Sequence, residues 1–314
     1  MIRWRLLALL LAVPAWARKP PPLPPLPPLV LPLDAPVITA SISGKPVRLR
    51  VDPGGETYVA LTAAAMTRLD LAGDWPRTDG KPPRRGDINM AIGQLRKDVP
   101  FSVEALDIAG RPKSVRVVAT ALDNTALGGA DGEIGVVALP HDDVVLQQPG
   151  SHPVWQQLPA RWGNDNGSGT LFFAWPAGGG QLEVELHPFR AISVASVAAA
   201  SRLAKDAGGH ITGPRRDAVL ALGFTRPVRT LVLGKPVDIA GARLRQLDVR
   251  LFDWSGRQAL PPDADDDMAL TVAGRHSRQR EWPVLRLGHD ALAGCTGFGF
   301  HRQQRLVEIA CPAP

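Results

Sequence analysis

The chain has 314 residues, of which 45% are hydrophobic and only 5% aromatic, and its formal net charge is +6. This length and apolar content are sufficient for two lobes of ordinary domain size. The basic clusters at Arg84-Arg85, Arg215-Arg216 and Arg275–Arg280 are separated and carry no interleaved aromatic residues or nucleic-acid-binding motif. They indicate a solvated basic surface, and no nucleic-acid partner is expected.

The N-terminus has the pattern of an export signal. Arg3 and Arg5 form a short basic region, Leu6–Val13 an apolar stretch, and Ala15–Ala17 a small-x-small cleavage motif. We therefore expect residues 1–17 to be a signal peptide and the protein to be periplasmic or secreted, of bacterial type. No later apolar run reaches the length of a membrane span, so no transmembrane segment is expected.

Residues 18–36 are rich in proline and separate the leader from the rest of the chain. The run Lys19–Pro28 is typical of polyproline II, which acts as a semi-rigid spacer. We interpret 18–36 as a linker; docking of this run into an aromatic groove of a partner is the alternative.

Short strands then follow one another, with little helix. Val37–Ser43 alternates between apolar and polar residues, Gly44-Lys45 is a hairpin turn, and Val47–Val51 is the return strand. The turn Asp52–Gly55 then reverses the chain. Further strands are predicted at Ile88–Ile92, Val115–Val118, Asp131–Gly135, Arg229–Leu233 (followed by Gly234-Lys235), Leu244–Leu251, Val284–Gly288 and Leu306–Ala310.

One segment occurs twice in the chain. Val47–Ala65 is matched without a gap by Leu182–Ala200, which lies 135 residues later. Each copy is an alternating strand, a tight turn containing proline, and a stretch of small, helix-forming residues. A repeat of this kind determines the architecture, and here it predicts two similar lobes that face each other across a cleft.

This order of elements resembles the pepsin/retropepsin family of aspartic proteases. In that family each lobe has a strand hairpin, then Asp-Thr/Ser-Gly, then a short helix, a flap hairpin and a later apolar-Gly motif. Val37–Leu69 matches the opening module, Ile134-Gly135 and Leu287-Gly288 match the later motif, and the flap falls at Ile88–Gln94. The resemblance implies an all-β, two-lobed acid-protease-like fold of double-psi-type β-barrels with short helices. It places an N-terminal lobe at 37–160 and a C-terminal lobe at 161–314.

The resemblance also implies the site residues, and two departures bear on activity. Asp52 stands at the first catalytic position, but the second is His187, although the family uses two carboxylates that share one proton. The threonine whose hydroxyl ties the two loops together in the family is replaced by proline in both copies, and Phe189 stands where the first copy has Gly54. Binding contacts are expected from the loop and the flap, at Gly54, Gly55, Met90, Ile92 and Gly93.

Several roles remain open for these residues. Asp52 and His187 can form a mixed acid–base pair, since histidine is a general base near neutral pH. His187 can instead be a structural residue of a degenerate loop, and Asp52 a turn residue that accepts backbone N–H groups.

The two cysteines suggest a disulfide, whereas the two acidic clusters do not have the pattern of a metal site. Cys295 and Cys311 are the only cysteines and flank the last predicted strand, so an exported chain is expected to join them, with Cα atoms about 4.4–6.8 Å apart; two free thiols are the alternative. Asp263–Asp267 lacks the glycine and closing glutamate of a calcium loop, and His141–Asp143 has no second ligand pair nearby. No metal and no cofactor are expected.

Two classes of function follow. One is a degenerate, non-catalytic relative that binds an extended peptide or a cell-envelope polymer in the cleft between the lobes. The other is an active aspartyl endopeptidase that uses Asp52 by a divergent route, or by pairing two copies of Asp52 in a dimer. The sequence does not determine the oligomeric state.

Overall fold

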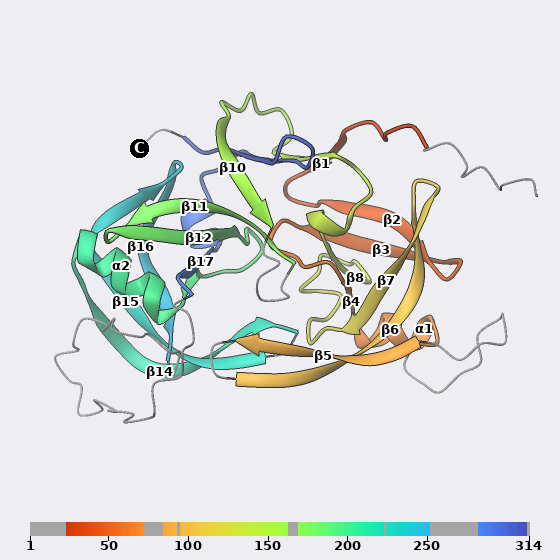
Figure 1. The fold of residues 1–314 in the computed structure, drawn as a ribbon, viewed down its shortest axis with the longest axis horizontal. Helices are drawn as coiled ribbons and strands as arrows, with labels where there is room; N and C mark the ends of the chain where they lie inside the picture. The colour runs from red at the N-terminus through yellow and green to blue at the C-terminus, as the bar shows by residue number, and fades with distance from the viewer. Residues whose placement is uncertain are drawn as a thin grey trace, which may run out of the picture.

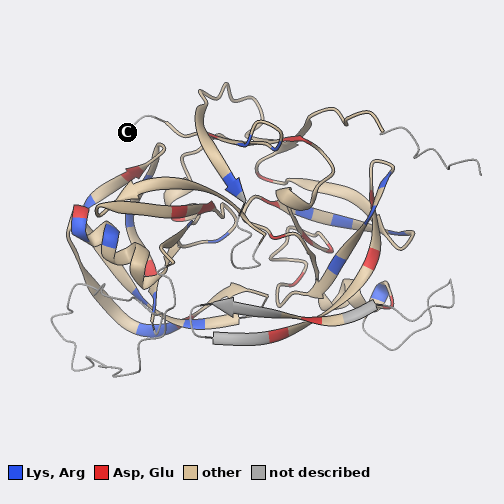
Figure 2. Cartoon of the chain, in the orientation of Figure 1, with Lys and Arg blue, Asp and Glu red and all other residues tan. Residues whose placement is uncertain are grey.

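The computed structural model describes residues 23–71, 84–92, 95–162, 169–222, 224–251 and 282–312. Strands dominate these ranges, and the helices are short (Figure 1). Basic and acidic residues occur on the strands of both halves of the molecule (Figure 2). The first half contains β1 (Leu29–Pro32), β2 (Val37–Ile42), β3 (Lys45–Asp52), β4 (Val59–Leu61), α1 (Ala63–Arg68), β5 (Arg84–Ile92), β6 (Leu95–Ile108), β7 (Arg111–Ala119), β8 (Gly132–Gly135), a 3-10 turn (Val136–Ala138), β9 (Asp143–Gln147) and β10 (Gln156–Trp162). The second half contains β11 (Leu171–Ala177), β12 (Gly180–Leu186), β13 (Val194–Ala195), α2 (Val197–Ala207), β14 (Gly209–Ala221), β15 (Phe224–Ile239), β16 (Ala242–Arg250), β17 (Val284–Leu287), α3 (His289–Leu292), β18 (Gly297–His301) and β19 (Leu306–Ala310).

The elements β2 to β8 and α1 form one lobe, here called the N-terminal lobe. Its sheet has the strand order β2-β3-β8-β4-β7-β6-β5. Strand β8 lies between β3, to which it is parallel, and β4, to which it is antiparallel, while β4 is parallel to β7. The hairpin β5–β6 extends from this sheet toward the other half of the molecule (Figure 1).

The elements β11 to β17 and α2 repeat this topology in a C-terminal lobe. Strand β17 lies between β12, to which it is parallel, and β13, to which it is antiparallel, while β13 is parallel to β16. The hairpin β14–β15 corresponds to the hairpin β5–β6. The all-β, two-lobed architecture predicted from the sequence is therefore confirmed, and each copy of the repeat occupies the same place in its lobe.

A third set of strands bridges the lobes and contains both ends of the described chain. Its order is β1-β9-β18-β19-β10, and it continues into the C-terminal lobe through β11 (Figure 1). Its inward residues, among them Leu146, Phe298 and Ile309, belong to the same buried cluster as the cores of both lobes. The lobes are thus held together by continuous packing.

Two sequence predictions need correction in detail. Leu29–Pro32, expected in the linker, forms β1 and pairs with β9, because its alternating Leu-Val-Leu pattern suits a strand and its proline falls at the strand end. Gly234-Lys235 lies within the long strand β15, at a shift of register between Val232 and Val237. The turn into β16 is made instead by Ala240 and Gly241, both of which have positive φ.

Cys295 and Cys311 form the disulfide expected from the sequence, at the open end of the hairpin β18–β19. Their Cα atoms are 3.9 Å apart, closer than the predicted range. The proposed leader, the first part of the linker, and the acidic segment Asp263–Asp267 lie outside the described residues. No helix in the described ranges is long and apolar enough to cross a membrane.

His301 joins three strands of the bridging sheet. Its Nδ1 lies 2.8 Å from Asp143 on β9 and its Nε2 lies 2.9 Å from Glu308 on β19. Burial alone lowers the pKa of His301, but the hydrogen bonds to both carboxylates outweigh burial and raise the pKa above its ordinary value. Only the protonated ring donates from both nitrogens, so the protonated form is the one that links the strands.

We expect this link to weaken the fold as the pH rises. A raised folded-state pKa adds stability that is complete below the unfolded pKa of about 6.5 and is lost as the pH rises through the folded value. Urea denaturation from pH 5 to 9 should therefore show this decline in the wild type and a flatter profile in His301→Gln. Replacement of the exposed His152 by Gln is the control, and an identical pH profile for wild type and His301→Gln would contradict the prediction.

Candidate site between the lobes

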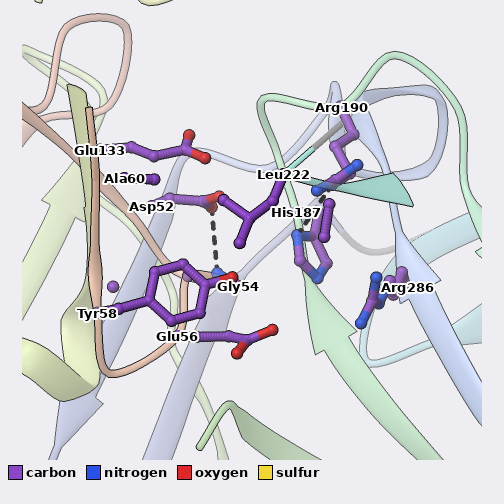
Figure 3. A pocket seen from close by; sticks show the side chains of 13 residues that line it. Asp52, Gly54, Glu56, Tyr58, Ala60, Glu133, His187, Arg190, Leu222 and Arg286 are labelled. Atoms are coloured by element: carbon purple, nitrogen blue, oxygen red, sulfur yellow. Dashed lines mark hydrogen bonds between the residues drawn. The ribbon is translucent and has the colours of Figure 1, made fainter. Parts of the chain in front are cut away.

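The two matched positions of the repeat meet in one buried pocket. Asp52 is the last residue of β3, and His187 directly follows β12, its counterpart (Figure 3). Asp52 is 7% exposed and His187 is 3% exposed, and both line the pocket. The match between the two copies of the repeat puts Asp52 and His187 on equivalent loops. In the structure these two loops face each other.

The loop after Asp52 is tied by its own backbone. The amide of Gly54 donates to Oδ1 of Asp52 at 3.1 Å, and the amide of Gly55 donates to the carbonyl of Asp52 at 3.0 Å. A Cβ added to Gly54 would lie 2.2 Å from Cε1 of His187, so the imidazole packs directly on this glycine. A Cβ on Gly55 would lie 2.6 Å from the Cα of Gly135. Both glycines, predicted as binding residues, are thus closely packed, Gly54 against the His187 ring and Gly55 against the backbone of Gly135.

Both ring nitrogens of His187 have partners. Nε2 lies 3.1 Å from Oε2 of Glu185, and the Nε–H of Arg190 donates to Nδ1 at 3.3 Å. A nitrogen that accepts from arginine carries no proton, so we assign the neutral tautomer with the proton on Nε2. Burial lowers the pKa of His187, and the hydrogen bond to Glu185 offsets this only in part. The imidazole has neither a free lone pair nor a free proton to offer a water molecule beside Asp52.

Each of the two loops is preceded by a strand that carries one residue of an ion pair. The strand before the loop supplies the basic residue in the N-terminal lobe and the acidic residue in the C-terminal lobe. In the N-terminal lobe Arg50 on β3 pairs with Glu133 on β8 at 3.0 Å. In the C-terminal lobe the equivalent strands carry the reverse order, Glu185 on β12 and Arg286 on β17, at 2.8 Å. Burial alone raises the pKa of Glu185, but Arg286 and the hydrogen bond from His187 outweigh it and lower the pKa to about 2.

At the pocket, the N-terminal lobe presents acidic side chains and the C-terminal lobe presents a histidine and basic side chains. The N-terminal lobe contributes Asp52, Glu56 and Glu133, and the C-terminal lobe contributes His187, Arg190 and Arg286 (Figure 3). The guanidinium of Arg50 lies 4.9 Å from the ring centroid of Phe189 on the opposite loop, a cation–π distance. Phe189, which stands where the first copy of the repeat has Gly54, is therefore part of the lobe contact.

Burial raises the pKa of two carboxyl groups of this network, those of Glu56 and Glu133. Burial raises the pKa of Glu56 to about 8, against the opposing charge of Arg286. Burial and then the charge of Asp52 raise the pKa of Glu133. Beside Glu56, burial and the Glu56 charge raise the pKa of Tyr58 well above its ordinary value. The pocket thus places the Asp52 side chain in the same cavity as Glu56, whose pKa lies well above its ordinary value.

The space above the pocket is closed by an apolar cluster from both lobes. Leu222, at the tip of the hairpin β14–β15, lies over the gap between Asp52 and His187 (Figure 3). The cluster has members from the N-terminal lobe, from the hairpin β14–β15 and from β13 of the C-terminal lobe, and they are Ala60, Val99, Val118, Val194, Leu220 and Phe224. The remaining cavity has a volume of about 30 Å³, room for roughly two water molecules. It does not accommodate an extended peptide while the hairpin stays in this position.

The predicted flap residues are only partly placed. Met90 and Ile92 lie on β5, at the end of the hairpin β5–β6, while Gly93 lies outside the described residues. Ile88 of the same strand packs against the apolar cluster. The base of the predicted flap thus approaches the hairpin of the other lobe.

Sequence reasoning missed most of the charged residues around the pair. Glu185 stands two residues before His187, as Arg50 stands two before Asp52, so the repeat itself contained the charge reversal. Glu133 and Arg286 precede the two apolar-Gly motifs at equivalent positions, but only the strand pairing shows that they face Arg50 and Glu185. In the described ranges no group of three His, Cys, Asp or Glu side chains is arranged to hold a metal ion.

Comparisons with known proteins do not establish a family for this chain. No protein-family model matches the chain, and no curated protein sequence matches it. Among solved structures, the chain is similar to an EIAV protease complexed with the inhibitor HBY-793, at 16% identity and a TM-score of 0.22. The match covers 32% of this chain and 81% of that one. The fold assignment therefore rests on the strand topology described above.

Proposed function

We propose that this chain is an exported, non-catalytic member of the aspartic-protease-like fold. The observation that carries the proposal is the state of His187, whose two ring nitrogens are both engaged by Glu185 and Arg190. A dyad needs a second carboxyl group that shares a proton with the first, and the position that supplies it in the family has become part of a lobe contact. The disulfide and the leader-like N-terminus support export.

We further propose that the ligand is an extended peptide or a cell-envelope polymer bound between the lobes. The hairpins β5–β6 and β14–β15 offer backbone groups at their edges, which pair with extended chains irrespective of side-chain chemistry. Because Leu222 and its apolar neighbours fill the space over Asp52, binding requires the tip of the hairpin β14–β15 to move.

A second candidate is an endopeptidase that uses Asp52, and one observation favours it. Glu56 and Glu133 line the same pocket as Asp52, and Glu56 keeps its proton to about pH 8. A protonated carboxyl group beside a carboxylate is the chemical requirement of an acid–base pair. An endopeptidase built by pairing Asp52 residues of two chains has less support. The C-terminal lobe already covers the Asp52 loop, so two such loops can meet only if the lobes separate.

A peptide-library assay distinguishes these functions. We expect the purified protein to produce no pepstatin-sensitive cleavage between pH 3 and 7, because general acid–base catalysis contributes about 10²–10⁴-fold for each positioned group and one group is missing. The triple variant His187→Asp/Pro188→Thr/Phe189→Gly should not recover full activity, since Pro53 still lacks the hydroxyl that ties the loops. Peptides that are retained but left intact would identify the binding function.

The assay needs a matched acidic variant. Asp70→Asn removes a carboxylate from an exposed ion pair and should behave as the wild type does. Cleavage that persists in Asp70→Asn but is abolished in both Asp52→Asn and Glu56→Gln would overturn the non-catalytic proposal and establish the acid–base pair.

A further inference from the structure

A second and much larger hollow lies on the C-terminal lobe, away from the Asp52–His187 pocket. It is a groove between β16 and the segment that runs from α3 to the disulfide, with a volume of about 700 Å³. Sites for small organic molecules occupy roughly 300–1,000 Å³, so the groove has the size of a ligand site. Its walls include Arg243 and Arg245 of β16, Asp290 and Ala291 of α3, and the cysteines Cys295 and Cys311.

The groove is fixed by covalent and backbone constraints. The bond between Cys295 and Cys311 lies in its wall. Gly241 has a φ of +81°, and a Cβ at this position would lie 2.9 Å from the Cβ of Cys311, so the turn before β16 packs closely on the disulfide. A site held in this way needs little reorganisation when a ligand enters.

The polar chemistry of the groove is mainly cationic. Arg243 and Arg245 alternate with buried residues on β16, so both side chains project from the same face and are exposed. Within the described part of the chain neither guanidinium has an ion-pair or hydrogen-bond partner. The single carboxylate, Asp290, is already engaged, because its Oδ1 accepts from the amide of Ser193 at 2.9 Å and from its hydroxyl at 2.7 Å.

The rest of the wall is apolar. Ala291, Ala293, Pro312 and the disulfide present carbon and sulfur atoms beside the two arginines. Guanidinium groups bind carboxylates and phosphates through two parallel hydrogen bonds. The apolar part of such a ligand can pack against the apolar wall of the groove. From this combination we propose that the groove binds a small organic oxyanion, a carboxylate or a phosphate monoester carried on an apolar body. This site is independent of the function proposed for the cleft.

The test uses simple probes on the full-length protein. Phenyl phosphate and benzoate combine an oxyanion with an apolar ring, and benzyl alcohol is the neutral analogue. We expect saturable binding of at least one oxyanion by calorimetry, with amide shifts in NMR spectra at Ala291 and Gly294, and no saturation with benzyl alcohol. The two oxyanions distinguish a phosphate site from a carboxylate site.

Paired variants separate a built site from general charge attraction. Arg243→Gln/Arg245→Gln should weaken binding at least tenfold, because both substitutions remove charge-assisted hydrogen bonds to the oxyanion. Arg161→Gln/Arg305→Gln removes the same charge from exposed positions elsewhere and should bind as the wild type does. The proposal is overturned if neither oxyanion saturates, if benzyl alcohol binds equally well, or if both double variants lose affinity to the same extent.

Discussion

Replacement of Arg286 by methionine should destabilise the protein by about 3–5 kcal/mol, the usual cost of removing one partner from a buried ion pair. Arg286 lies 2.8 Å from Glu185, whose side chain is 3% exposed, and it is also the main opposing charge for Glu56. Without the guanidinium the carboxylate of Glu185 keeps only His187 and Thr170 as hydrogen-bond partners. Urea denaturation at pH 7 measures the loss of free energy of unfolding.

The pH dependence gives the same experiment a second readout. A depressed folded-state pKa stabilises above the unfolded value of about 4.5, and this contribution is lost as the pH falls toward the folded value, here about 2. Arg286→Met should therefore lack much of the acid-induced loss that the wild type shows. Arg68→Met removes an exposed ion pair with Asp131 and should cost at most about 1 kcal/mol. Equal losses in the two variants would contradict the buried-network account.

The second large effect is expected at Gly54. A Cβ at this position would lie 2.2–2.5 Å from three atoms of the His187 ring, and that ring is held by Glu185 and Arg190. We expect Gly54→Ala to cost about 1–3 kcal/mol, as is typical of overpacking in a well-filled core. The cost should fall sharply in a His187→Ala background, because the ring that causes the clash is absent. Thermal or urea unfolding of the four proteins completes this double-mutant cycle.

A matched glycine checks that the effect is local. A Cβ on Gly294 would meet its nearest atoms, in Pro312, at 3.5 Å, which is ordinary van der Waals contact. Gly294→Ala should therefore change stability much less than Gly54→Ala. If the Gly54→Ala cost is unchanged when His187 is alanine, then the imidazole does not pack against the Asp52 loop as described.

Much of the fold could be predicted from the sequence because each copy of the repeat is determined by neighbouring residues. The strand before Asp52, its turn and the following helix are fixed by alternation and turn residues, and the second copy preserves each of these at the same spacing. The same alternation was also present in Leu29–Val30–Leu31, but the surrounding prolines obscured it, and the strand forms only because β9 supplies a partner.

The site was only half predictable, for a physical reason. The positions of Asp52 and His187 follow from the repeat, whereas the pKa of His187 depends on its burial and on how Glu185 and Arg190 are oriented. Arg190 is three residues from His187, but the sequence does not show that its guanidinium turns back to the ring. The closure by Leu222 depends on two long hairpins meeting across the lobes, which local patterns do not encode.

The proposed function depends on His187 being a neutral imidazole with both ring nitrogens engaged, at the position that matches Asp52. Nitrogen-15 NMR of the ring, assigned by the loss of its signals in His187→Gln, tests it most directly. We predict a protonated Nε2 and an unprotonated Nδ1 at neutral pH, with titration only below the ordinary histidine pKa because burial lowers the value. A ring that is doubly protonated at pH 7, or whose Nδ1 shift changes when pepstatin is added, would contradict the account.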